Sequence, residues 1–262
     1  MNTLREAAFG AHPGRWPLPR AETVEERWLR AVASGGQGRY ATATAELDTI
    51  ARTGAGGPFL ALALSTRASF LRQLGWHAHA RTWDGRALAV AGTDGEARTD
   101  ALIGLSADAL GLGRFPLSAR LLAAAEAARG AVDEIGPARL PVRLGWVGAE
   151  LAMATGDGST AVGRAERAVA LASDLGSVRH AVKSDVVLAA ALCCAGQLER
   201  SRRLADATLE AAEANGLLPL TWALACLLAE VGSNSRAPAQ LVALREDCAT
   251  AVQARGGVWS NR

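Results

Sequence analysis

Six copies of a short glycine-led pattern divide this sequence at nearly regular intervals. In each copy, a glycine is followed five positions later by alanine or serine. Each glycine follows one apolar helical stretch and precedes another, and glycine commonly ends a helix because it adopts the left-handed conformation. The spacing predicts six helix-turn-helix units that stack along the chain. The glycines lie 37, 38, 43, 40 and 36 residues apart, at Gly38, Gly75, Gly113, Gly156, Gly196 and Gly232.

The composition also favours helices over strands. The chain has 262 residues, of which 58 are alanine, while aromatic residues make up only 5%. Alanine has the highest helix propensity and is depleted in strands, whereas aromatic residues favour strands. The small residue of each copy, such as Ala43 or Ala161, would begin the second helix of its unit, where closely approaching helices exclude large side chains. We therefore expect an all-α fold.

The glycine pattern resembles the core of the tetratricopeptide repeat (TPR). The first copy, Gly38-Arg39-Tyr40 followed by Ala43, is similar to the Gly-x-Tyr-x-x-Ala that lies between helices A and B in that family. The period here is longer, and the proline that usually ends each repeat is mostly missing. The resemblance implies a right-handed TPR-like superhelix of six repeats, in which helices A line a concave groove. Such degenerate repeats occur in bacterial regulatory and adaptor proteins.

The repeats account for most of the chain. We assign residues 23–256 to the TPR-like helical repeat domain, residues 1–22 to an N-terminal arm and residues 257–262 to a C-terminal tail. The arm is rich in proline and does not fit a repeat. It is either an ordered segment packed by Trp16 and Leu18 or a flexible tail.

Charge, hydropathy and cysteine content exclude several classes of protein. The net charge is +2, too balanced for a protein that binds nucleic acid through a clustered basic face. Met1–Gly10 has no apolar run, so we expect no secretory signal. The longest apolar stretches, Val186–Ala195 and Leu217–Ala229, are shorter than the ~20 residues of a membrane span. We expect a cytoplasmic protein with four reduced cysteines, Cys193, Cys194, Cys226 and Cys248.

Signatures of catalysis and of cofactor binding are missing from the sequence. The only lysine is Lys183 and it does not follow a glycine, which excludes a phosphate-binding P-loop. The pair formed by His77 and His79 has no carboxylate or cysteine at ligand spacing, so a metal site there is not expected. We expect no enzyme activity, no metal and no cofactor.

Counting back from each glycine identifies residues that would face the groove. In the fourth unit these are Arg143, Trp146, Glu150 and Met153, and in the sixth the prominent one is Trp222. Tryptophan, methionine and charged groups together suit a peptide or a small amphiphile. The alternative is that both tryptophans fill the core between helices, because tryptophan is mostly buried whatever its role. The same count adds Leu62, Ser65, Ser69, Arg72, Asp100, Ile103, Ala107, Lys183, Val186, Ala190, Cys193 and Cys226.

A basic cluster opens the fifth unit. Ser177 is a good N-cap, and Arg179, His180 and Lys183 follow it on one face of the expected helix. Cations are unusual in the first turn of a helix, because the dipole favours acidic groups there. We interpret the cluster as a site for an anion, a carboxylate or a phosphate. The alternative is a solvated helix start whose charge is balanced by acidic neighbours, which would be Asp185, Asp174 or Glu150.

The predicted function is binding without catalysis. In the leading hypothesis, the protein is an adaptor whose groove holds a peptide or protein segment, with Arg143 and Lys183 on an acidic or C-terminal carboxylate group. In the second, it is a ligand- or peptide-sensing regulator that acts in trans on a transcription regulator or sigma factor. Neither hypothesis involves direct nucleic-acid or membrane binding. The last helix, which carries Leu241, Leu244 and Cys248, would be a cap or a homodimer interface.

Overall fold

The computed structural model describes residues 3–53, 56–130 and 138–260. Those residues form thirteen α-helices and no strand, which confirms the all-α prediction. The helices are α1 (Thr3–Phe9), α2 (Val24–Gly36), α3 (Tyr40–Arg52), α4 (Pro58–Gln73), α5 (His77–Val90), α6 (Gly95–Gly111), α7 (Phe115–Gly130), α8 (Arg139–Ala154), α9 (Gly158–Asp174), α10 (Val178–Cys194), α11 (Leu198–Ala214), α12 (Leu218–Val231) and α13 (Pro238–Ala254).

Each of the six glycines lies in the turn between two consecutive helices, and each has a positive φ. At Gly156, for example, φ is 80°. Its N–H donates to the carbonyl of Met153 (3.1 Å), and the N–H of Asp157 donates to the carbonyl of Ala152 (2.9 Å). This pair of hydrogen bonds closes the end of α8 and needs a residue that enters the left-handed region without strain.

The small residue of each copy lies where the two helices of a pair touch. In five copies this residue is fully buried near the start of the second helix: Ala43, Ala80, Ser118, Ala161 and Ser201 are all 0% exposed. Ala237, in the sixth copy, is exposed because α13 begins later, at Pro238, and the residue forms its N-cap. The sequence pattern therefore predicted the close contact in every pair except the last.

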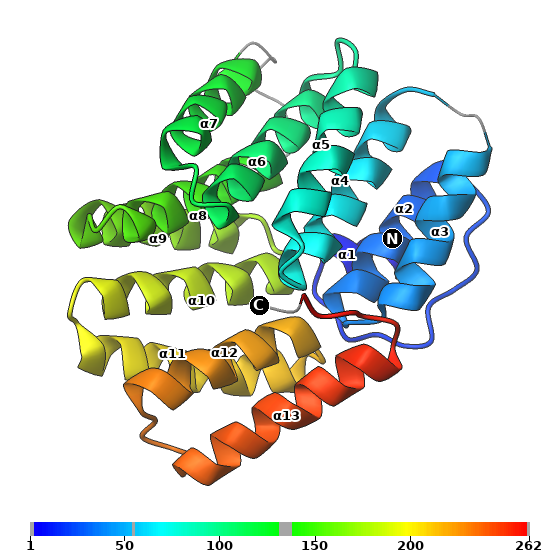
Figure 1. The fold of residues 1–262 in the computed structure, drawn as a ribbon. Helices are drawn as coiled ribbons and strands as arrows, with labels where there is room; N and C mark the ends of the chain where they lie inside the picture. Colours follow the sequence, from blue (N-terminus) through cyan, green and yellow to red (C-terminus); the bar gives the residue numbers. More distant parts are fainter. Residues whose placement is uncertain (1–2, 54–55, 131–137, 261–262) are drawn as a thin grey trace.

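The helices form two layers around a common centre (Figure 1). The inner layer consists of α2, α4, α6, α8, α10 and α12, each of which packs against the next inner helix. The outer layer consists of α3, α5, α7, α9, α11 and α13. Each outer helix packs against the inner helix before it in the chain, so the six pairs stack side by side.

The last pair of helices contacts the first, so the arc of pairs closes on itself. The backbone N–H of Ala41 donates to the carbonyl of Arg255 (2.9 Å), and the Arg255 guanidinium donates to the carbonyl of Gln37 (3.0 Å). Beyond α13 the tail crosses to the turn between α4 and α5, where the N–H of Ser260 donates to the carbonyl of Leu74 (2.8 Å). The inner helices therefore surround the centre on all sides.

The N-terminal arm is ordered over its described residues. Residues 3–9 form α1, which packs against α2 and α10. Leu18 is buried, whereas Trp16 is 40% exposed and lies under the Arg39 guanidinium, 3.8 Å from the ring centroid. Of the two expected possibilities, the packed arm is the one observed.

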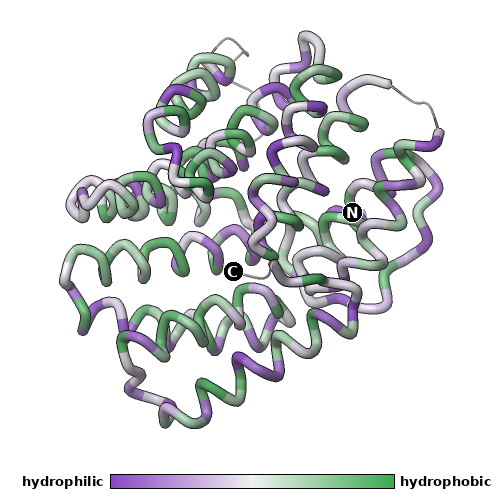
Figure 2. Tube along the Cα trace, viewed as in Figure 1, coloured by the Kyte–Doolittle hydropathy of each residue, from purple (hydrophilic) through white to green (hydrophobic). Residues whose placement is uncertain are grey.

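The core consists of several apolar clusters between neighbouring helices, as expected of a stack of pairs. Leu29, Ile103, Leu192 and Leu228 are among its fully buried side chains. Figure 2 shows hydrophilic residues interspersed along the helices. Within the described ranges, the helices are too short or too polar to span a lipid bilayer. All four cysteines are free thiols.

Candidate functional site

A cavity of about 450 Å³ lies at the centre of the ring. Its wall is formed by residues of all six inner helices, together with His77 at the start of α5. Both terminal segments also contribute, through Phe9 of α1 and Trp259 of the C-terminal tail. Cavities of 300–1,000 Å³ are the size that encloses a small organic molecule.

Seven of the eight residues proposed from the sequence line this one cavity, although they come from three separate helices. The exception is Met153, which packs instead into the core between α8, α9 and α10, near Ala149 and Leu192. The proposed role of Met153 in ligand contact therefore has no support from its position. The seven that line the cavity are Arg143, Trp146, Glu150, Arg179, His180, Lys183 and Trp222.

The other groove positions predicted by counting back from each glycine agree best with the cavity lining in α4, α6 and α8. Ser65, Ser69 and Arg72 of α4 line the cavity, as do Asp100, Ile103 and Ala107 of α6. On α10 and α12 the cavity meets only the first part of each helix, so the later positions of these two helices lie outside it. The predicted positions outside the lining are Leu62, Val186, Ala190, Cys193 and Cys226.

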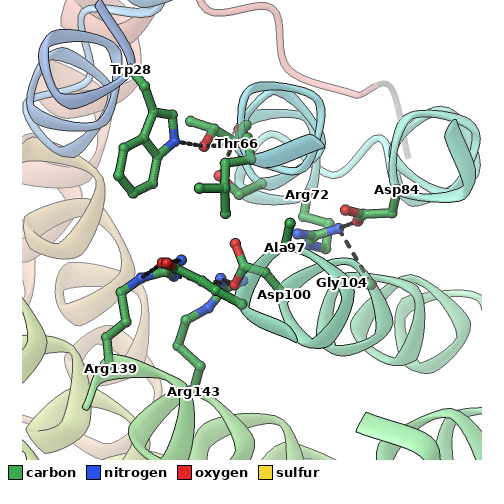
Figure 3. A network of polar contacts seen from close by, with 12 residues as sticks. Trp28, Thr66, Arg72, Asp84, Ala97, Asp100, Gly104, Arg139 and Arg143 are labelled. Atoms are coloured by element: carbon green, nitrogen blue, oxygen red, sulfur yellow. Dashed lines mark hydrogen bonds and ion pairs between the residues drawn. The ribbon is translucent and has the colours of Figure 1, made fainter. Parts of the chain in front are cut away.

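Two arginines of α8 reach across to acidic groups on α6 (Figure 3). Asp100, which is 4% exposed, forms ion pairs with Arg143 and with Arg139, the latter at 3.2 Å. Arg139 also pairs with Glu96 at 2.7 Å. Burial, together with repulsion from Arg72, lowers the pKa of Arg143 to about 10. Both of these α8 cations are therefore engaged by carboxylates of the protein itself.

Lys183, the only lysine, also has a partner. Its Nζ lies 3.3 Å from Glu150 Oε1 and 5.9 Å from the centroid of the Trp146 ring. The indole N–H of Trp146 donates to Ser184 Oγ (2.8 Å). One part of the alternative interpretation of the basic cluster is thus correct, because Glu150 balances the Lys183 charge.

His180 is not a cation in this environment, contrary to our interpretation of the basic cluster. It is 2% exposed and stacks on Trp146, with ring centroids 5.4 Å apart. Burial, reinforced by repulsion from Arg179, lowers its pKa well below the usual range. Ser177 Oγ lies 2.9 Å from His180 Nδ1 and makes no capping bond to the helix backbone, although Ser177 is the N-cap residue. The imidazole is a neutral part of the wall.

Arg179 differs from the other cations of the cavity. Among the residues that the structure describes, it forms no ion pair, and its Nε is buried without a hydrogen-bond partner. Burial and repulsion from Arg139 lower its pKa to about 10. Its closest aromatic contact is Phe9, whose ring centroid lies 5.8 Å from the guanidinium carbon. The cavity therefore contains a charged group with no carboxylate opposite it in the described chain.

A second buried network lies at the α4 side of the cavity. Arg72 pairs with Asp84 of α5 (Figure 3) and with Asp108 of α6, and both carboxylates are fully buried. Burial raises the pKa of Asp84 to about 7, while Arg72 opposes that rise. One arginine cannot fully compensate two buried carboxylates, so the pair binds a proton up to a higher pH than exposed carboxyl groups do.

Aromatic side chains supply the apolar part of the wall. Trp28 donates its indole N–H to Thr66 Oγ1 (3.0 Å) and packs against Phe9, with ring centroids 5.4 Å apart. Since the N–H groups of Trp28 and Trp146 are both used within the protein, the two indoles offer ring surface to a ligand and no free hydrogen bond.

A scan against protein-family models and a search of curated proteins found no match to this chain.

Some residues of the wall were missed by the sequence analysis. Arg139 lies one helical turn before Arg143, so extending the count by four residues would have included it. Trp28 and Val32 occupy in α2 the positions that Trp146 and Glu150 occupy in α8, relative to the following glycine. Phe9 had no such signal, because it lies outside the repeats.

Proposed function

We propose that this protein is a non-catalytic receptor that binds a small anionic ligand in the cavity at the centre of its helical ring. The observation that carries the proposal is the wall itself. It combines aromatic rings from several helices with a cation, Arg179, that has no carboxylate partner in the described residues. A wall of this kind is typical of ligand sites, in which a few polar groups orient a largely apolar molecule.

The proposal favours a sensor over an adaptor that holds a long protein segment. Phe9 and Trp259 bring both terminal segments of the chain into the wall, and the arc of helices is closed. A compact ligand fits a cavity of about 450 Å³ better than an extended segment does. A peptide would enter through its terminus, in which case its free carboxylate offers the same chemistry. The proposal includes a regulatory partner protein that responds to the ligand-bound form of this protein.

Binding without turnover is favoured by the state of the titratable groups. The two carboxylates in the described lining, Asp100 and Glu150, are held in ion pairs with Arg143 and Lys183. His180 is buried, and Ser177 occupies its Nδ1. A general acid or base must reach the substrate in a usable protonation state, and none of these three groups is free to do so.

For the fold, we propose that the six helix pairs are degenerate TPR-like repeats in a right-handed superhelix. This is supported by the recurring glycine turns and by the buried small residue at the start of five outer helices. Closure of the arc by the contacts between Ala41 and Arg255 would make this superhelix a ring.

The receptor proposal is tested by filling the cavity with a larger side chain. Ala107 lines it from α6, whereas Ala207 lies on the exposed surface of α11. Thermal-shift screening of the purified chain against small carboxylates and short peptides is expected to identify ligands that raise the melting temperature. Ala107→Phe should weaken their binding by about tenfold or more, while Ala207→Phe should leave it unchanged. Equal binding by both variants would contradict a ligand site in this cavity.

A further inference from the structure

The cations of the cavity can be compared by the partners they have. Among the described residues, four of the five cations that line it are ion-paired, and Arg179 is not. Arg139 and Arg143 are balanced by Glu96 and Asp100, whereas Arg179 lies beside Arg139, so the described residues at this end of the cavity carry one positive charge more than negative. The four paired cations are Arg72, Arg139, Arg143 and Lys183.

The position of Arg179 is held from several sides. Gly36 of α2 lies against its stem, because a Cβ on Gly36 would be 3.0 Å from Arg179 Cδ. Phe9 lies at 5.8 Å from its guanidinium carbon. A partly buried guanidinium whose Nε has no hydrogen-bond partner and which lies beside another arginine, Arg139, carries a cost in free energy. A bound anion would remove that cost, which makes the site selective for negative charge.

The surroundings of Arg179 are aromatic. Four rings lie at this end of the cavity: Phe9, Trp28, Trp146 and the neutral His180. The rings of His180 and Trp146 are stacked at an interplanar angle of 24°. Planar rings pack well against such surfaces, and offset or edge-to-face contacts add to the burial of apolar area.

From these observations we propose that Arg179 anchors the carboxylate of an aromatic monoanion whose ring packs between Trp28 and Trp146. This inference rests on the proposed receptor function and specifies its ligand. The single charge that has no carboxylate partner among the described residues matches a monoanion, whereas a phosphate dianion would need a second such cation. The planar guanidinium forms two parallel hydrogen bonds to a carboxylate, which fixes its orientation. The carboxylate could belong to a small molecule or to the C-terminal aromatic residue of a peptide.

The test uses naphthoate, a planar aromatic carboxylate, and naphthamide, which has nearly the same shape but no charge. Calorimetric titration of the wild-type chain is expected to give a dissociation constant for naphthoate about tenfold or more below that for naphthamide. Arg179→Gln should abolish this preference. Arg167→Gln is the matched control, since Arg167 is exposed on α9 and lies outside the cavity lining, and it should keep the preference. Circular dichroism establishes that each variant is folded.

The outcomes separate this inference from the function on which it rests. Equal affinity of the wild type for the two probes would overturn the role of Arg179 but leave the cavity as a ligand site. If Arg179→Gln still prefers naphthoate to naphthamide, the role of Arg179 is overturned too. Failure of both probes to bind would contradict the receptor function as well. The dipeptide acetyl-Ala-Trp, free and amidated, distinguishes the two sources: tighter binding of the free form than of naphthoate assigns the anchor to a peptide terminus.

Discussion

Trp222 on α12 and Trp259 in the C-terminal tail pack with their ring centroids 4.6 Å apart, and both line the central cavity. The tail is further held by the indole N–H of Trp76, which donates to the carbonyl of Val258 (2.7 Å). Trp259 itself donates to the carbonyl of Ala249 (3.4 Å). The tail is therefore part of the cavity wall, attached by contacts to three other parts of the chain.

Removing the Trp259 ring should loosen this wall. We expect Trp259→Ala to lower the free energy of unfolding by about 1–3 kcal/mol and to speed both entry and release of naphthoate. Stopped-flow fluorescence measures the two rates, and chemical denaturation measures the stability. Trp16→Ala is the control, because Trp16 lies in the other terminal segment outside the cavity lining. Equal rates in the two variants would show that the tail does not limit access.

Arg179 and Arg139 should affect stability in opposite directions. Arg179→Met removes a charge that has no partner in the described chain, so the empty protein should be unchanged or more stable. Arg139→Met leaves Glu96 without its ion-pair partner and Asp100 paired with Arg143 alone, so it should cost about 1–3 kcal/mol. Urea denaturation of both variants checks this. Equal destabilisation would mean that Arg179 has an essential structural partner.

The Asp84 carboxyl should make stability depend on pH. Its pKa is raised to about 7 by burial, so the folded state binds a proton that the unfolded state releases near pH 4. The sign follows from proton binding: the contribution of Asp84 to stability is fully present below about pH 4 and is lost as the pH rises to about 7. One pKa unit corresponds to about 1.4 kcal/mol, so a loss of at least that size is expected.

The measurement for Asp84 is denaturation at several pH values between these limits. In Asp84→Asn the group cannot titrate, so the difference in stability between wild type and variant should change over this range in the stated direction. Asp174→Asn, at an exposed position at the end of α9, is the control. If the wild type and Asp84→Asn have parallel profiles, the buried carboxyl does not hold its proton.

Two glycines of the fourth helix pair should respond oppositely to the same substitution. Gly156 has φ of 80°, and Gly163 lies on the exposed surface within α9, with a helical backbone. An added Cβ would meet no atom within 4 Å at either position, so only the backbone conformation differs. Gly156→Ala should destabilise by about 1 kcal/mol, and Gly163→Ala should stabilise by about 0.5–1 kcal/mol. Thermal denaturation of both variants tests this.

The order of the helices could be predicted from the sequence because the signal is local. A glycine in the left-handed conformation ends a helix wherever it occurs, and the small residue after it marks a close helix contact. Counting back the same number of residues from successive glycines placed Arg143 and Lys183 on a common surface, and both line the cavity. The prediction of a buried small residue failed only in α13, since the longer entry segment of this helix leaves Ala237 exposed.

The sequence could not predict which charged side chains of the cavity have ion-pair partners, because these pairs form between segments that are far apart in the chain. Lys183 was the most conspicuous cation in the sequence, yet Glu150 neutralises it from the preceding inner helix. Arg179 looked like one of three similar cations until the structure showed which of them had partners. Phe9 and Trp259 lie outside the repeats, and only closure of the ring brings them to the wall.

The most direct test of the central claim is a crystal structure of the wild-type chain with naphthoate. The account predicts the carboxylate within hydrogen-bond distance of the Arg179 guanidinium and the naphthalene ring against Trp28 or Trp146. It also predicts that the ion pair between Lys183 and Glu150 stays intact. Naphthoate bound outside the ring, or bound in the cavity with its carboxylate on Lys183, would contradict the account.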